Sequence, residues 1–238
     1  AALAACTGTA KLLARAGAIG RYQPDRFTPR ALASMARSVG VDDTLLPELT
    51  YLLEVEQRHG VRSTLFFLDN KSWANSDYSF HDELFEHVVE IGVKAGCDFG
   101  LHGTLDSAGD ADILQSEASD FRSAVFSTVT SVRQHHLLSL PEIRRSQRAA
   151  GFEADSSLGY NHGTAFRAGT ARPFQLFDHD QGAPLDLWEL PLIAMDSALA
   201  SDPGDASAAE TKLHHLIEVL AETQGVLTIN WHPNFGAA

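Results

Sequence analysis

The stretch that decides the fold is Cys97-Asp-Phe-Gly-Leu-His102-Gly-Thr-Leu-Asp106, in which a short apolar run leads into a polar segment. The residues up to Leu101 favour a buried strand, and a histidine, a glycine, a threonine and an aspartate follow closely. The spacing of His102 and Asp106 lets an imidazole and a carboxylate point at one ion in a loop or a first helical turn. A single histidine at a strand end is nevertheless more often a structural hydrogen-bonding group than a ligand.

Two further expected strands also end in histidine, which strengthens the case for a site. The β-branched run Thr128–Val132 continues through Arg133 to His135, and Val226–Trp231 is followed directly by His232. Strand alternation would place Arg133 and His135 on one face. Three histidines at strand ends are hard to ascribe to core packing.

Helical and strand patterns alternate along most of the chain, which predicts a parallel sheet wrapped by helices. The remaining expected strands are 61–68, 152–158 and 187–193, and the expected helices are 46–60, 80–95, 110–125, 141–151 and one whose capping box is Ser207 and Glu210. Residues 159–180 show no sustained period and are expected to form a long loop. The pattern leaves barrel and open sheet as alternatives, and in both the ligand-binding residues lie at the C-terminal ends of strands.

Composition narrows the class of protein. The chain of 238 residues suits one domain with a helical N-terminal segment at 1–45, of which residues 1–40 are expected to pack as helices outside the barrel and to supply no ligand. With 18 basic and 31 acidic residues the net charge is −13, which disfavours nucleic acid and anionic membranes as partners. The two cysteines lack metal-binding spacing, and no signal peptide or membrane span is recognised, so we expect a cytoplasmic protein.

Taken in order, these motifs resemble the polysaccharide deacetylase superfamily from Leu46 to Phe235. The segment from His102 to Asp106 falls where that family has a histidine motif with two metal ligands, and Arg133 falls in its arginine motif. Phe166–Phe174, Glu189–Pro191 and Trp231-His232 look like a divergent bacterial branch. The resemblance implies an α/β fold, a distorted (β/α) barrel of about seven parallel strands, and hydrolysis of N-acetyl or other amide bonds with zinc or a similar divalent ion.

The resemblance also implies roles for individual residues. It gives His232 as the acid that protonates the leaving group, with Arg133 and Asp155 in the catalytic set, and His102 and Asp106 as metal ligands. The strand-end position of His135 makes it the third expected metal ligand. The expected substrate-binding residues are Arg167, Arg172 and Trp231. For both of these arginines, salt-bridged loop structure is an equally good interpretation.

One departure from the family bears on catalysis. Its first strand ends in paired aspartates, and before Leu46 the only such pair is Asp42-Asp43, which follows Gly40-Val41 and is interpreted as a helix cap. The first catalytic strand is therefore either upstream of Ala1 or absent. The main hypothesis is a metal-dependent hydrolase acting on a carbohydrate; the alternatives are an inactive domain that binds carbohydrate or a protein partner, and a hydrolase of small cyclic amides.

Overall fold

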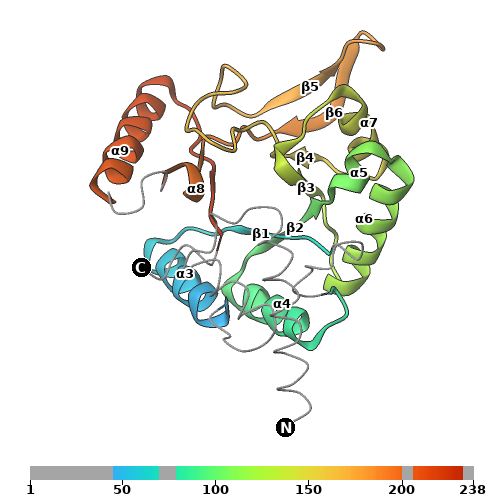
Figure 1. Cartoon of the computed structure of the whole chain (residues 1–238), viewed down its shortest axis with the longest axis horizontal. Coiled ribbons are helices and arrows are strands. Elements are labelled where there is room, and N and C mark those ends of the chain that lie inside the picture. The colour runs from blue at the N-terminus through green and yellow to red at the C-terminus, as the bar shows by residue number, and fades with distance from the viewer. Residues whose placement is uncertain (1–44, 70–78, 200–205, 233–238) are drawn as a thin grey trace, which may run out of the picture.

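The largest element of the described structure is a six-stranded sheet with helices packed around it (Figure 1). The computed structural model describes residues 45–69, 79–199 and 206–232. Six strands lie in the order β1-β2-β3-β4-β6-β5. Their bounds are β1 Thr64–Phe67, β2 Asp98–Gly103, β3 Ser131–Gln134, β4 Ala154–Asp155, β5 Phe174–Asp178 and β6 Ala183–Glu189. Neighbours from β1 to β6 pair in parallel, and β5 is an antiparallel edge strand. The expected parallel sheet is confirmed.

A second, smaller sheet stands beside the first. It pairs β7, Ala194–Met195, with β8, Ile229–Asn230, in parallel. Within the described residues no hydrogen-bonded ladder joins β8 to β1, so these strands form two sheets rather than a closed barrel.

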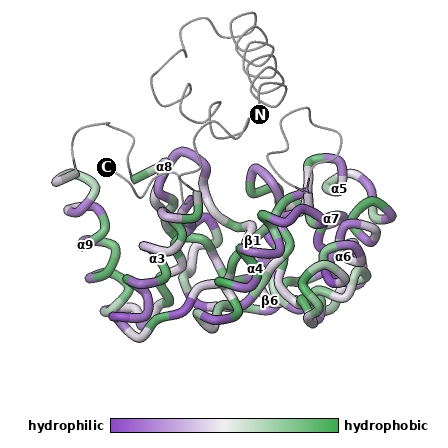
Figure 2. Tube along the Cα trace, turned by 90° about the horizontal axis from the view of Figure 1, so that it is seen from below, coloured by the Kyte–Doolittle hydropathy of each residue, from purple (hydrophilic) through white to green (hydrophobic). Residues whose placement is uncertain are grey.

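Helices cover the sheet because their apolar residues recur at helical spacing. They are α3 Leu45–His59, α4 Glu83–Ala95, α5 Leu105–Gly109, α6 Ala111–Val125, α7 Pro141–Ala149, α8 Asp196–Leu199 and α9 Ala206–Thr223, with a 3-10 turn, η2, at His135–Leu137. Figure 2 shows hydrophobic and hydrophilic residues together along α6 and α9, as in amphipathic helices. None of the helices in the described residues is long and apolar enough to cross a membrane.

Aromatic side chains from several elements form the centre of the main core. Phe80, Phe85 and Phe121 are at most 3% exposed, and the rings of Phe80 and Phe121 are 4.9 Å apart. Leu101 of β2 and Val132 of β3 contribute the apolar face of the sheet to the same cluster. This core holds the strands whose ends carry the polar residues of interest.

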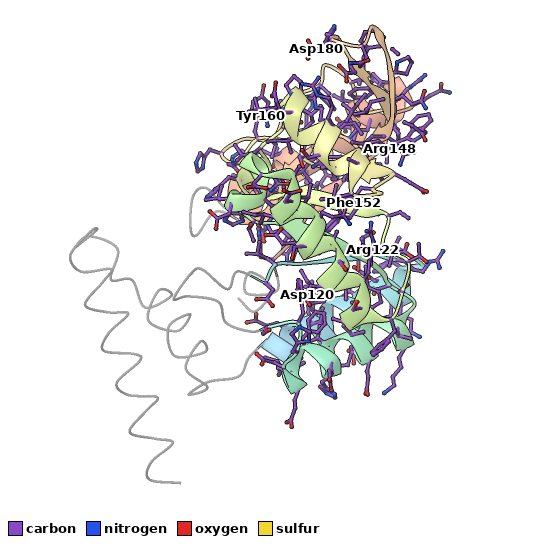
Figure 3. All side chains as sticks on the ribbon, turned by 90° about the vertical axis from the view of Figure 1, so that its right-hand side faces the viewer. Asp120, Arg122, Arg148, Phe152, Tyr160 and Asp180 are labelled. Atoms are coloured by element: carbon purple, nitrogen blue, oxygen red, sulfur yellow. The ribbon has the colours of Figure 1, made fainter. Side chains whose placement is uncertain are left out.

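Arg122 of α6 fixes the starts of two strands. Its guanidinium donates hydrogen bonds to the carbonyl oxygen of Val129, before β3, and to that of Ala150, before β4, at 2.9–3.0 Å. The same group lies 4.9 Å from the centre of the Phe152 ring, and Figure 3 labels both side chains beside α6. Arg122 therefore sets the relative position of β3 and β4 from the end opposite to their polar residues.

Some sequence predictions need correction. Part of the expected loop 159–180 is strand β5, which gains backbone partners by pairing with β6. Ser207 lies inside α9 rather than capping it, since the helix already includes Ala206. His135 is not in a strand, because β3 ends at Gln134 and the chain turns. The predictions for residues 1–44, including Asp42-Asp43, lie outside the described residues.

Candidate functional site

Polar residues collect where β2, β3 and β4 end. His102 of β2 is in register with Arg133 of β3, and Asp155 of β4 is in register with Val132. Neighbouring residues of a strand point to opposite faces, so His102 and Arg133 share one face of the sheet. Asp155 points to the other face, with the buried Val132. The expected strand-end positions are confirmed, and all three residues line one cavity, although the register turns the Asp155 side chain to the other face.

His102 and His135, two of the three predicted metal ligands, contact each other. The Nδ1 of His135 lies 3.1 Å from the Nε2 of His102, although His135 belongs to the turn after β3. That turn contains two left-handed residues, His136 and Leu137, each with φ of 55°. Residues other than glycine rarely adopt this backbone conformation, and such strain concentrates at functional sites. The turn, rather than strand alternation, brings His135 to His102.

The hydrogen bonds of His102 define its tautomer. Its Nδ1 lies 2.9 Å from the carbonyl oxygen of Arg133, which can only accept, so Nδ1 carries the proton. Burial, and next the neighbouring His135, lower the pKa of the His102 imidazole to about 3. The ring is therefore neutral at neutral pH, and its Nε2 lone pair faces His135. A neutral imidazole fixed by a backbone carbonyl is the form that binds metals.

Arg133 is a buried cation on the same face. It is 6% exposed, and its guanidinium donates to the Ser156 carbonyl at 3.1 Å, the Ser156 hydroxyl at 2.9 Å and Asn230 Oδ1 at 2.7 Å. The guanidinium carbon lies 4.4 Å from the centre of the Phe66 ring, which occupies the space that a Cβ on Gly100 would need. Burial lowers the pKa of Arg133 to about 10, so it stays charged at neutral pH.

The side chain of Asp155 is buried with a second carboxyl group. Asp155 is in register with Glu189 of β6, and the two are 1% and 0% exposed. Burial raises the pKa of both groups, and the nearby Asp155 raises that of Glu189 further. Asp155 Oδ1 accepts a hydrogen bond from Ser157 at 2.5 Å. The catalytic role of Asp155 stays a prediction: the residue lines the cavity, but its carboxyl group is buried beside Glu189.

His232 forms a dyad with Asp196, a residue that the sequence analysis missed. Its Nδ1 lies 2.9 Å from Asp196 Oδ1 and its backbone N–H donates to Oδ2 at 2.5 Å. A carboxylate oxygen accepts, so Nδ1 carries the proton and Nε2 is the ring nitrogen turned away from Asp196. Asp196 is 1% exposed, whereas the His232 side chain is 47% exposed. The arrangement is a fixed imidazole that can exchange a proton with a substrate through Nε2.

One signal for Asp196 was present in the sequence. It directly follows the buried strand β7, just as His232 comes soon after β8, and these two strands are paired. The strand-end argument that selected the histidines applies equally to this aspartate.

A cavity of about 750 Å³ connects these groups. Its polar lining includes His102, Arg133, Asp155, Ser156 and His232, and Trp231, which is 45% exposed, lines it too. Leucines of α3, together with residues of β1 and α4, provide an apolar wall. The volume is in the range of small-molecule sites.

The other predicted site residues lie elsewhere. Arg167 donates at 2.9 Å to the carbonyl oxygens of Leu137 and Gly159, and Arg172 donates to that of Thr223. Neither arginine lines the cavity, and these contacts match the alternative interpretation, loop structure. Substrate binding by either stays a prediction.

The donor set fits a divalent ion in part. Two nitrogens bound to one tetrahedral zinc at 2.0–2.1 Å are about 3.3 Å apart. His102 Nε2 and His135 Nδ1, 3.1 Å apart, are close to this spacing if His135 adopts its other tautomer. However, the described residues contain no group of three or more His, Cys, Asp or Glu side chains that could hold a metal. Asp106 does not join the pair, because Thr104 caps α5 and Asp106 lies exposed in its first turn.

Comparison with known proteins supports the fold. No family model matches the chain, and no match to a curated protein was found. A protein from Mycobacterium smegmatis, provisionally assigned as a polysaccharide deacetylase, is similar in structure with a TM-score of 0.61 and 16% identity; the match covers 91% of this chain and 72% of the other. A Bordetella bronchiseptica protein, provisionally assigned as a polysaccharide deacetylase of O-antigen biosynthesis, matches with a TM-score of 0.48 and 16% identity over 78% and 65% of the two chains.

Proposed function

We propose, from the premise that this chain has the fold of the mycobacterial deacetylase, that it hydrolyses an N-acetyl amide bond of a carbohydrate. The observation that carries the proposal is the Asp196–His232 dyad beside a cavity that also contains His102 and Arg133. Amide hydrolysis needs a proton for the departing amine, because an unprotonated amine is a poor leaving group. A half-exposed imidazole held by a buried carboxylate supplies that proton.

In this proposal His232 donates from Nε2 while Asp196 accepts the hydrogen bond from Nδ1–H. The buried carboxylate keeps the ring in one orientation and stabilises its positive charge. Arg133 provides a fixed positive charge in the cavity wall, which stabilises negative charge that develops on a substrate oxygen. Ser156 and Asn230 hold its guanidinium in place, so little reorganisation is needed.

A divalent ion is part of the proposal, with His102 and His135 as ligands. Such an ion would supply Lewis acidity towards the amide carbonyl. The neutral tautomer of His102, fixed by the Arg133 carbonyl, suits this role. The described residues provide no third metal ligand beside His102 and His135, and the proposal assigns no base that activates water.

The apolar wall and Trp231 support a sugar as substrate. Aromatic and apolar side chains with a few polar groups are typical of pockets for small molecules. Trp231 is adjacent to His232 in the chain, so a sugar ring stacked on the indole would lie near the proton donor.

The test is release of acetate from N-acetylglucosamine oligomers by the purified chain supplied with zinc. His232→Ala should lower turnover by about 10²–10⁴-fold, the usual contribution of a general acid. His214→Ala is the matched control, because His214 is an exposed histidine of α9 that does not line the cavity. Binding of the oligomer without any release of acetate would instead favour the non-catalytic carbohydrate-binding domain.

A further inference from the structure

The carboxyl groups of Asp155 and Glu189 form a buried pair that the proposed reaction does not use. They are register partners on neighbouring parallel strands, so their side chains leave the sheet on the same face from backbones about 4.8 Å apart. Both are essentially inaccessible to solvent. Two full negative charges this close, without water, would be strongly unfavourable.

Hydrogen bonding leaves one oxygen of each group without a donor. Asp155 Oδ1 accepts from the Ser157 hydroxyl, and Glu189 Oε1 accepts from the Leu158 N–H at 2.9 Å. Asp155 Oδ2 and Glu189 Oε2 are buried and have no partner. A buried acceptor without a donor costs about 1–3 kcal/mol. A single proton between the two groups would satisfy both oxygens, since one would donate and the other accept.

Two guanidinium groups lie near the pair and favour negative charge on it. Arg133 of β3 acts on both carboxyl groups from the cavity side, and Arg144 of α7 acts on both from the helix that covers this part of the sheet. Within the described residues neither arginine forms a direct ion pair with the two carboxyl groups, and Arg133 is held by Ser156 and Asn230 instead.

We propose that Asp155 and Glu189 share one proton, and that Glu189 is thereby a positioning residue for Arg133. The path runs through β4. Ser156, next to Asp155, holds the Arg133 guanidinium through its carbonyl and hydroxyl oxygens. The backbone of β4 is tied to β6 by the bond from Leu190 N–H to the Asp155 carbonyl at 2.8 Å. Repulsion between two ionised carboxylates would separate β4 from β6 and move Ser156. The proposal concerns the folded chain and does not depend on which substrate is hydrolysed.

Infrared difference spectroscopy tests the shared proton directly. A protonated carboxylic acid has a carbonyl band apart from the carboxylate bands. At neutral pH, Glu189→Gln and Asp155→Asn should each remove the same single acid band from the wild-type spectrum. No acid band in the wild type, or an acid band that survives in both variants, would overturn the proposal. Removal of two different bands by the two variants would mean that both groups are protonated, which also overturns it.

The positioning role has its own readout. Glutamine mimics the protonated carboxyl group, so Glu189→Gln should keep the folded structure. The side chain in Glu189→Asp is shorter, so this variant should not share a proton with Asp155. Because burial raises the pKa of Glu189, wild-type stability towards urea should fall as pH rises from about 5 to about 9, and in Glu189→Gln this slope should be lost. An identical slope in wild type and Glu189→Gln would refute the role of Glu189 even if other variants failed to fold.

Discussion

Replacing Asp196 with asparagine isolates what the carboxylate contributes to the dyad, because the two side chains have nearly the same shape. Asp196 accepts from three donors: the backbone N–H groups of Ser197 and His232, at 2.6 Å and 2.5 Å, and the Nδ1–H of His232 at 2.9 Å. An asparagine has one acceptor oxygen and a donor amide, so it cannot serve all three. Either one N–H loses its partner or the His232 ring changes tautomer.

The magnitudes follow from these contacts. Loss of a hydrogen bond to a charged group costs about 1.5–3 kcal/mol, which lowers the melting temperature by roughly 3–12 °C in a chain of this size. The effect on turnover should be larger: about 10²–10⁴-fold, as for other dyads whose histidine loses its orienting carboxylate. KM should change little, because Asp196 is buried and does not line the cavity.

The assay is acetate release from an N-acetylated oligosaccharide, measured well below the melting temperature of the variant. Asp186→Asn is the matched control, because Asp186 is a strand residue whose side chain is 75% exposed in an ion pair with Arg148. The double variant of Asp196→Asn with His232→Ala should be no slower than His232→Ala alone, since both changes disable one unit. Wild-type turnover in Asp196→Asn, or additive losses in the double variant, would refute the dyad as the proton donor.

Three further outcomes are expected. His102→Ala should reduce the divalent metal bound by the purified chain, measured by elemental analysis after dialysis; unchanged metal content would remove His102 from the ligand set. Arg122→Ala should lower the free energy of unfolding by about 2–4 kcal/mol, while Arg148→Ala, which removes an exposed ion pair, should cost about 0–1 kcal/mol; similar melting temperatures would contradict this ranking. Because the pKa of His102 is lowered to about 3, the stability of the metal-free chain should be lost as pH falls from about 6.5 towards 3, and His102→Gln should lessen that loss in urea titrations; an unchanged pH dependence would argue against a buried neutral imidazole.

The sequence predicted correctly those site residues that lie at the C-terminal end of a parallel strand, because such positions depend only on where the strand ends. His102 and Arg133 lie side by side because their strands are in register, and that follows from alternating helix and strand patterns. His232 belongs to the same group. The sequence cannot give pairings between distant segments, and the expected strand 187–193 stopped before β7, so the partner of His232, Asp196, was missed although it follows a strand.

Local backbone conformation explains the other misses. The argument for His135 assumed a strand, but His136 adopts a left-handed conformation that no pattern of apolar residues indicates. Asp155 was correctly placed at a strand end, yet its face depends on register with Val132 and Glu189, which only the structure supplies. Strand β5 was hidden because an antiparallel edge strand with a register shift lacks the apolar run of a buried parallel strand.

The bond between Arg133 and Asn230 joins residues 97 positions apart, and it has a consequence for how the protein is made. Domains begin to fold from the N-terminal side during synthesis. Strand β8, however, is translated after every other described helix and strand, and it carries Asn230 next to the segment of His232. A nascent chain can therefore assemble β1 to β6 while Arg133 still lacks Asn230 and Asp196 still lacks His232. The cavity is therefore without Asn230 and His232 until β8 has been translated and has paired with β7.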